Sequence, residues 1–176
     1  MTRTAARSAL AALLVAACAC ASSPTSVTTS IRASDCSNPP SDVKARFDEK
    51  DLGVQRCPGA SGWDVLVVSS DANSWIELRS PTTSWSSETA IVYEMPIGLF
   101  PGIHSDTPLE WRSDRGEPTA LLFTVSAQDP DDAETRLTRI FVARFDDDDV
   151  PVCIIGRVSS PAEARTLADS GRGCSG

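Results

Sequence analysis

The 176-residue chain contains a single histidine, His104, and none of its six cysteines stands in C-x-x-C spacing. A zinc site needs several such ligands at short spacings, so we expect no metal site and no cofactor. A Ser/His/Asp triad would have to use His104, yet the strand–turn–helix elbow that presents a nucleophilic serine is missing. We therefore interpret His104 as an exposed loop residue and assign no catalytic residue.

The chain also has no run of the ~20 apolar residues that a transmembrane helix needs and no basic stripe with interleaved aromatic residues. It carries 24 acidic against 16 basic side chains, a net charge of -8. An acidic domain repels phosphate backbones and anionic lipid. The composition therefore argues against nucleic-acid binding, and leaves a lipid anchor as the only membrane contact we expect.

The first 21 residues are typical of an export signal. Arg3 and Arg7 form a short positive region, and residues 9–17 form an apolar stretch that is too short to span a bilayer. No Arg-Arg pair precedes the stretch, so the twin-arginine route is not supported. We expect the mature chain to reach the periplasm or the cell surface.

Two ways of processing this signal remain open. Residues 15–18 (V-A-A-C) resemble a bacterial lipobox, which predicts lipidation at Cys18; lipidation at Cys20 or simple cleavage after Ala21 are the alternatives. Lipidation at Cys18 leaves five cysteines, whereas the alternatives leave an even four. In each case the Ser/Thr-rich residues 22–34 are predicted to be a flexible tether, followed by a single domain over residues 35–176.

Residues 64–158 are a series of short β-type runs separated by turn residues. Neighbouring runs joined by short acidic loops predict hairpins and an antiparallel sheet. The fold class is therefore all-β or β-rich α+β, as a sandwich or open barrel of about seven strands. The Gly/Pro-rich residues 97–108 are predicted to be an exposed loop. The seven predicted strands are residues 64–70, 75–79, 89–95, 109–113, 118–128, 136–145 and 152–159.

One C-terminal helix is well marked. Ser160 is a good N-cap, Pro161 follows at the first helical position, Glu163 completes a capping box, and Gly171 ends the helix. A weaker pattern predicts one helical turn within residues 43–51.

The cysteines of the mature domain are expected to form disulfides. The four cysteines allow three pairings, which sequence alone does not distinguish. Because neighbours along the chain meet most easily, we favour Cys36 with Cys57 and Cys153 with Cys174.

Several short motifs resemble those of a family of uncharacterised exported proteins of proteobacteria. Residues 57–67 (C-P-G-A-S-G-W-D-V-L-V) match its C-P-G-x-x-G-[aromatic]-x-V-x-V run, and residues 110–120 match its E-W-R-x-x-x-G-x-P-x-A segment. Cys153, the Ala-Arg-x-x-Ala-Asp helix and Cys174 resemble its C-terminal end, although Glu163 stands where that family usually has Asn. The resemblance implies a domain with two disulfides and no assigned activity.

Two acidic runs, residues 129–134 and 146–149, raise the question of a calcium site. They stand at opposite ends of a ten-residue predicted strand, roughly 30 Å apart at ~3.3 Å per residue. Neither run has the spacing of a calcium-binding loop. We interpret both as solvated hairpin turns.

The tryptophans and one arginine are candidates for a partner surface. Trp63 and Trp111 are predicted to be core residues, with Arg112 facing outward on the opposite side of its strand from Trp111. Trp75 and Trp85 flank Ser/Thr/Pro-rich turns and are predicted to be the more exposed aromatics. Together with Arg112 they form the predicted partner surface.

Two functions from different classes fit these patterns. The first is a non-enzymatic module of the cell envelope that binds a protein or another envelope component. The second is a secreted hydrolase with a carboxylate pair in a cleft. An exposed apolar patch favours the first, and a deep pocket lined by two carboxylates favours the second.

Overall fold

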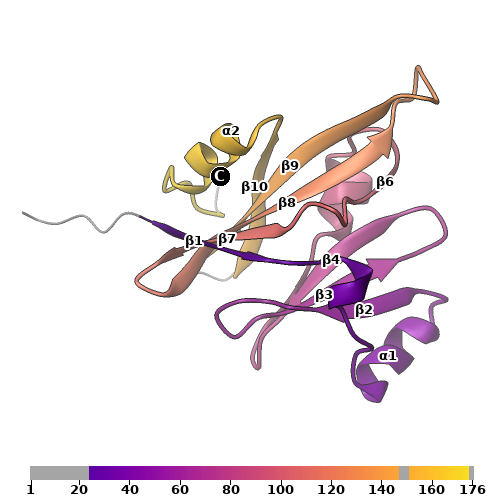
Figure 1. Cartoon of the computed structure of the whole chain (residues 1–176), viewed down its shortest axis with the longest axis horizontal. Helices are drawn as coiled ribbons and strands as arrows, with labels where there is room; N and C mark the ends of the chain where they lie inside the picture. The colour runs from indigo at the N-terminus through magenta and orange to yellow at the C-terminus, as the bar shows by residue number, and fades with distance from the viewer. Residues whose placement is uncertain (1–23, 147–150, 175–176) are drawn as a thin grey trace, which may run out of the picture.

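The computed structural model describes residues 24–146 and 151–174, which form two antiparallel sheets and several short helices (Figure 1). The strands of the larger sheet are β1 (Thr25–Thr29), β6 (Leu99–Ile103), β7 (Leu109–Asp114), β8 (Glu117–Gln128), β9 (Arg136–Phe145) and β10 (Val152–Val158). Those of the smaller sheet are β2 (Gly53–Cys57), β3 (Asp64–Ser69), β4 (Ser74–Arg79) and β5 (Ser84–Ser86). The helical segments are η1 (Ala33–Asp35), α1 (Ser41–Asp48), η2 (Thr89–Glu94) and α2 (Pro161–Ala168). The predicted β-rich antiparallel fold is confirmed.

The strands of the larger sheet are ordered β1-β7-β8-β9-β10, with β6 also paired to β8, and those of the smaller sheet β2-β3-β4-β5. The main core lies between the sheets. Leu66 and Ile76 of the smaller sheet belong to the same buried cluster as Trp111 and Phe123 of the larger one. Each fully buried side chain of this size stabilises the fold by about 1.5–3 kcal/mol, so this core carries most of the stability.

A second, smaller core lies on the outer face of the larger sheet, under α2. Ala120 and Leu122 of β8 contact Ala164 and Ala168 of the helix there. Residues 120–127 of β8 are all buried, so both faces of this strand are covered, the outer one by α2 at Ala120 and Leu122.

The start and end of α2 follow the predicted pattern. The Ser160 hydroxyl accepts the Glu163 N–H at 3.3 Å, and the Glu163 carboxylate accepts the Ser160 N–H at 3.2 Å. Gly171 beyond the helix has a φ of +70°, a conformation that costs glycine little. The capping box therefore fixes where the helix begins as the chain leaves β10.

Both favoured disulfides are present: Cys36 is bonded to Cys57, and Cys153 to Cys174. The first joins the segment before α1 to the end of β2, and the second joins β10 to the chain after α2. Paired cysteines of this kind indicate folding in an oxidising, exported environment. No helix in the described part of the chain is long and apolar enough to cross a membrane.

The tether prediction for residues 22–34 is wrong from Thr25 onward. Residues 25–29 form β1, which pairs with β7 along its whole length, and the Thr29 hydroxyl accepts the indole N–H of Trp111 at 2.9 Å. Hydroxyl side chains that suggested flexibility here include β-branched threonines, which suit a strand. Farther on, the single turn predicted within residues 43–51 is the longer helix α1.

Residues 89–95 were predicted to be a strand, which is wrong, because most of them form the π-type helix η2. The Ser87 hydroxyl accepts the N–H of Ile76 at 3.0 Å and donates to its carbonyl at 3.1 Å. This side chain takes the place of further ladder bonds beyond β5, and the chain turns into a helix that buries Ala90 and Ile91.

The predicted loop at residues 97–108 is also partly wrong, because it contains β6. The N–H of Ile103 donates to the Ser74 hydroxyl at 2.8 Å, and β6 itself pairs with β8 through an irregular register. Pro101 is buried. A serine side chain from the other sheet supplies this anchor, and local sequence gives no sign of it.

Candidate functional site

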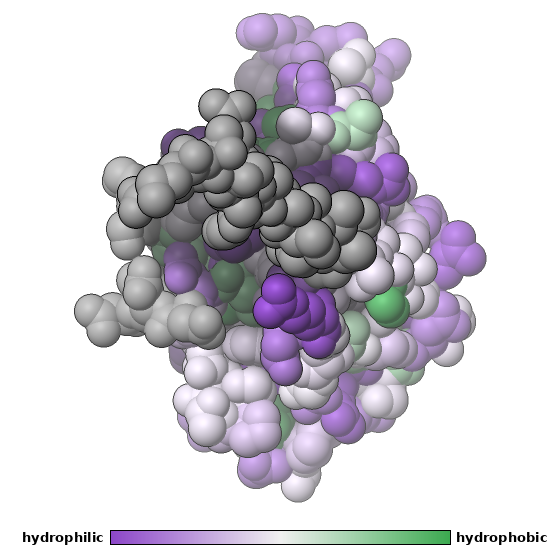
Figure 2. All heavy atoms as spheres, turned by 90° about the vertical axis from the view of Figure 1, so that its left-hand side faces the viewer, coloured by the Kyte–Doolittle hydropathy of each residue, from purple (hydrophilic) through white to green (hydrophobic). Residues whose placement is uncertain are grey.

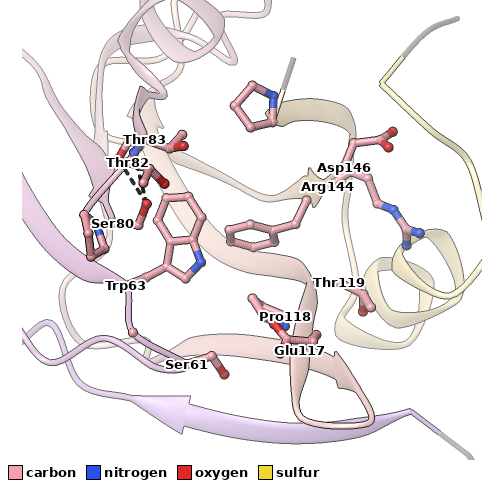
Figure 3. A pocket seen from close by; sticks show the side chains of 14 residues that line it. Ser61, Trp63, Ser80, Thr82, Thr83, Glu117, Pro118, Thr119, Arg144 and Asp146 are labelled. Atoms are coloured by element: carbon pink, nitrogen blue, oxygen red, sulfur yellow. Dashed lines mark hydrogen bonds between the residues drawn. The ribbon is translucent and has the colours of Figure 1, made fainter. Parts of the chain in front are cut away.

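One hollowed surface in the described part of the chain lies at one end of the two sheets. It is an open pocket of about 710 Å³, here called the Trp63 pocket. The β2–β3, β4–β5 and β9–β10 connections, the start of β8 and the end of β9 contribute to it. Its lining consists of residues 61–63, 80–83, 117–119, 144–146 and 151 (Figure 3).

Two half-buried aromatic rings form the apolar part of the pocket. The ring centroids of Trp63 and Phe145 are 5.1 Å apart at an interplanar angle of 59°. Phe145 in turn stacks on the buried Trp111, with centroids 6.0 Å apart. The pocket aromatics are therefore held rigidly, because they continue a row of rings that reaches into the core.

The turn that presents Trp63 has an unusual backbone. Ser61 and Gly62 have φ values of +51° and +80°. A Cβ atom at Gly59 would lie 1.8 Å from the Trp63 carbonyl oxygen, so only glycine fits there. The Ser61 hydroxyl also donates to the carbonyl of Gly116 at 3.4 Å, which joins this turn to the β7–β8 turn.

Hydroxyl groups line the pocket around the rings. In Figure 3, Ser80, Thr82 and Thr83 lie together on one side of Trp63, with Thr119 on the opposite side of the pocket. The Ser80 hydroxyl is used within its own turn, where it accepts the N–H of Thr83 at 3.1 Å. The hydroxyls of Thr82, Thr83 and Thr119 have no hydrogen-bond partner within the described part of the chain.

Three charged residues complete the lining. Asp146 accepts the backbone N–H of Cys174 at 3.1 Å, and Arg144 donates to the carbonyl of Ala168 at 3.3 Å. Both side chains therefore help to hold the C-terminal segment against the sheet. Glu117 is exposed at the β7–β8 turn, and its carboxylate forms no ion pair with any residue that the structure describes.

The pocket does contain two carboxylates, as the hydrolase hypothesis requires. A general acid at neutral pH usually has a raised pKa. Among the described acids, the carboxyl whose pKa is raised is that of Glu77 on β4, because burial disfavours its charged form. Glu77 does not line the Trp63 pocket, so the perturbed acid and the cleft lie apart.

The predicted partner surface does not form. Trp75 is buried, with 3% of its surface exposed, and Arg112 is buried at 9%; Trp85 is half-buried. The prediction of an exposed Trp75 is therefore wrong, because β4 turns this side chain into the inter-sheet core. For the other two tryptophans, Trp111 is a core residue as predicted, and Trp63 packs against the core while also lining the pocket.

Arg112 faces α2 and not solvent, which corrects the prediction of an outward-facing side chain. Its guanidinium donates to both oxygens of Asp169, at 3.1 and 2.5 Å, and to the Ser26 hydroxyl at 2.5 Å. Glu110 lies beside it and accepts a bidentate pair of bonds from Arg165. Hydrogen bonds from Arg165 lower the pKa of the Glu110 carboxyl. This network fastens β1 and α2 to β7.

The remaining candidates have local roles. The Nδ1 atom of His104 lies 3.2 Å from the Thr107 hydroxyl in the turn after β6. Asp129 and Asp132 accept backbone N–H groups within the β8–β9 turn, and a hydrogen bond from Thr135 lowers the pKa of Asp132. This acidic run is a hairpin turn, as predicted.

Two predictions fall on residues that the structure does not describe: the lipidation site Cys18 and most of the second acidic run, residues 147–149. Within the described ranges, no group of three or more metal-ligating side chains is found.

Three large apolar side chains are exposed on η2 and β6, which lie away from the end where β1 begins (Figure 1). Tyr93 of η2 and Leu99 and Phe100 of β6 are 70%, 46% and 58% exposed. Phe100 also has a φ of +52°, which is rare for a bulky residue. Exposed apolar side chains of this kind agree with the binding-module hypothesis.

Sequence reasoning missed the Trp63 pocket, although it singled out the segments that build it. Gly62-Trp63 and Gly116-x-Pro118 belong to the two motifs that carry the family resemblance, and the hydrogen bond from Ser61 to Gly116 brings them together. The Cys-Pro-Gly-x-x-Gly run before Trp63 was the available signal, because its glycines predict a tight turn that presents an aromatic side chain.

Comparison with known proteins does not assign the chain to a family. A scan against protein-family models finds no match, and neither a search of curated proteins nor one of solved structures finds any.

Proposed function

We propose that this chain is a non-enzymatic module of the cell envelope that binds an envelope component in the Trp63 pocket. The observation that carries the proposal is the pocket itself: a rigid aromatic pair, Trp63 and Phe145, beside three threonine hydroxyls that have no hydrogen-bond partner among the described residues. Ligand sites in proteins are concave, largely preformed and lined by aromatic side chains with a few polar groups. The Trp63 pocket has each of these features.

The position of the N-terminal strand supports an envelope role. Thr25 pairs with Ser113, and Ser113 pairs with Pro118 at the pocket, so β1 begins at the pocket end of the molecule (Figure 1). Thr25 is seven positions after Cys18, and a chain of that length spans at most about 25 Å, at ~3.6 Å per residue. Lipidation at Cys18, which belongs to the proposal, would hold the pocket end close to the membrane.

The surface at this end is suited to a hydrated ligand. In Figure 2, which faces this end, the coloured residues are mostly hydrophilic or intermediate, with some apolar atoms recessed among them. The resemblance to exported proteins without assigned activity also supports a role for the pocket, because two of the motifs that carry the resemblance meet there.

The second candidate is a hydrolase that uses Glu117 and Asp146, the two carboxylates of the pocket. It is the weaker one because Asp146 already accepts the N–H of Cys174. If it were correct, Glu117→Gln would abolish turnover of a hydrolysable envelope substrate. The binding proposal predicts that purified protein turns over no such substrate and that Glu117→Gln alters only retention.

Co-sedimentation with washed cell envelopes tests the proposal. The full mature domain should sediment with the envelopes, and Trp63→Ala should reduce the bound fraction about tenfold, since central aromatic anchors dominate binding energy. Trp85→Ala is the matched control, because Trp85 is also half-buried but does not line the Trp63 pocket. Circular dichroism establishes that each variant is folded.

A milder variant separates loss of binding from loss of folding. Thr82→Ala removes an exposed hydroxyl that holds no other part of the structure, so stability should not change while retention falls severalfold. Equal retention of wild type, Trp63→Ala and Thr82→Ala would contradict the proposal.

A further inference from the structure

We infer that the ligand of the Trp63 pocket is an uncharged saccharide chain. The inference rests on the proposed function and names the chemical class that the pocket would take. Three properties of the lining support it: the half-buried aromatic rings, the kind of polar groups around them, and the local charge.

The aromatic rings offer the surface that a sugar ring needs. The face of an aromatic ring carries a partial negative charge, and the axial C–H bonds of a pyranose form a weakly positive, apolar face. Trp63 and Phe145 are inclined at 59°, so together they present an angled apolar wall and not a flat slot. Such a wall suits the side of a sugar ring better than the edge of a planar heterocycle.

The polar groups match a ligand made of hydroxyls. Thr82, Thr83 and Thr119 provide three hydroxyls that can each donate and accept, and none has a partner in the described chain. Trp63 adds an indole N–H without a described partner, which lies on the side of Pro118 in Figure 3. Glu117 adds a carboxylate that only accepts. Sugar hydroxyls both donate and accept, so they can satisfy all three kinds of group.

The charge of the lining argues against an anionic ligand. Glu117 and Asp146 outnumber Arg144 in the pocket, and the whole chain carries a charge of -8. A phosphate or an anionic lipid headgroup would be repelled, because sites for such groups concentrate arginine and lysine. An uncharged ligand meets no such penalty.

The location argues against an extended peptide. Peptides are commonly bound as an added strand on a sheet edge, where backbone groups supply the affinity. The Trp63 pocket is instead lined by side chains from the turns at the ends of the strands. Its volume of about 710 Å³ lies within the range of small-ligand sites, ~300–1,000 Å³, and its open side lets a longer chain continue into solvent.

Nuclear magnetic resonance titration of the mature domain tests the inference. The probes are the neutral disaccharides diacetylchitobiose, cellobiose and maltose, with pentalysine as a peptide probe and inorganic phosphate as an anion probe. We expect at least one disaccharide to shift the Trp63 indole N–H signal with a millimolar dissociation constant. Trp63→Ala should weaken that binding about tenfold and Thr82→Ala severalfold, while Trp85→Ala leaves it unchanged.

The outcomes separate this inference from the proposed function. If no disaccharide shifts the Trp63 signal, or if only pentalysine or phosphate does, the saccharide inference is overturned. The proposed function survives that result provided that Trp63→Ala still releases the domain from envelopes. If envelope retention is also insensitive to Trp63, both fail together.

Discussion

At the scale of single residues, Arg112 shows how much one side chain can hold together. It donates to Asp169 after α2 and to Ser26 in β1, so both chain ends of the described domain depend on it. Its guanidinium is nearly buried, and a buried cation without partners would be costly. Its role is therefore structural, and the sequence could not reveal this because both partners are far away in the chain.

Replacing Arg112 should destabilise the domain strongly. Arg112→Met keeps much of the side-chain volume but leaves Asp169 and Ser26 without their donor, which we expect to cost about 2–3 kcal/mol, less than a fully buried pair because Asp169 is partly exposed. Urea denaturation measures the loss. Arg172→Met, at an exposed position, should change stability by less than about 0.5 kcal/mol; equal effects of the two variants would contradict the assigned role.

Glu110 predicts a specific pH dependence. Because hydrogen bonds from Arg165 lower its pKa from the ordinary value of 4.5, its carboxylate stabilises the fold at pH values above 4.5. That contribution is lost as the pH falls through the lowered pKa of the folded state. Glu110→Gln should therefore be less stable than wild type at pH 7, with the difference shrinking below pH 4.5. A difference that is constant from pH 7 to pH 3 would refute the ion pair.

At the scale of elements, local sequence patterns predicted the structure correctly where residues close together in the sequence are also close together in space. The β8–β9 hairpin, α2 and both disulfides were predicted, because each depends on residues close together in the chain. β6 and η2 were mistaken because contacts with β4 anchor them: the Ser74 hydroxyl accepts the N–H of Ile103 in β6, and Ser87, just before η2, bonds to Ile76. No window of sequence contains that information.

The Cys153–Cys174 disulfide should stabilise the folded domain by restricting the conformational freedom of the unfolded chain. Cys153 and Cys174 are separated by 21 residues, and closing a loop of that length stabilises by about 3 kcal/mol. The double variant Cys153→Ser/Cys174→Ser should lose about that much in chemical denaturation. Its helix should still form, since the capping box of Ser160 and Glu163 is intact; an unchanged unfolding midpoint would show that the bond contributes nothing.

At the scale of the whole molecule, the two ends differ in chemistry. The end where β1 begins carries the Trp63 pocket, and the other carries the exposed apolar side chains of Tyr93, Leu99 and Phe100. The composition predicted an exported, acidic, disulfide-bonded domain, but it did not predict that the two ends of the domain would differ in this way. The pocket is assembled from turns and strand ends spread over nearly one hundred residues, and only the fold brings them together.

Site-specific photo-crosslinking in cells that express the full chain tests most directly whether the Trp63 pocket is the binding site. Benzoylphenylalanine is placed at Thr82, on the pocket rim, and in a separate variant at Tyr93, at the opposite end. If the pocket binds the envelope component, Thr82 should yield an envelope-derived adduct that Trp63→Ala removes. An adduct from Tyr93 alone would contradict the proposal and place the binding surface on η2 and β6.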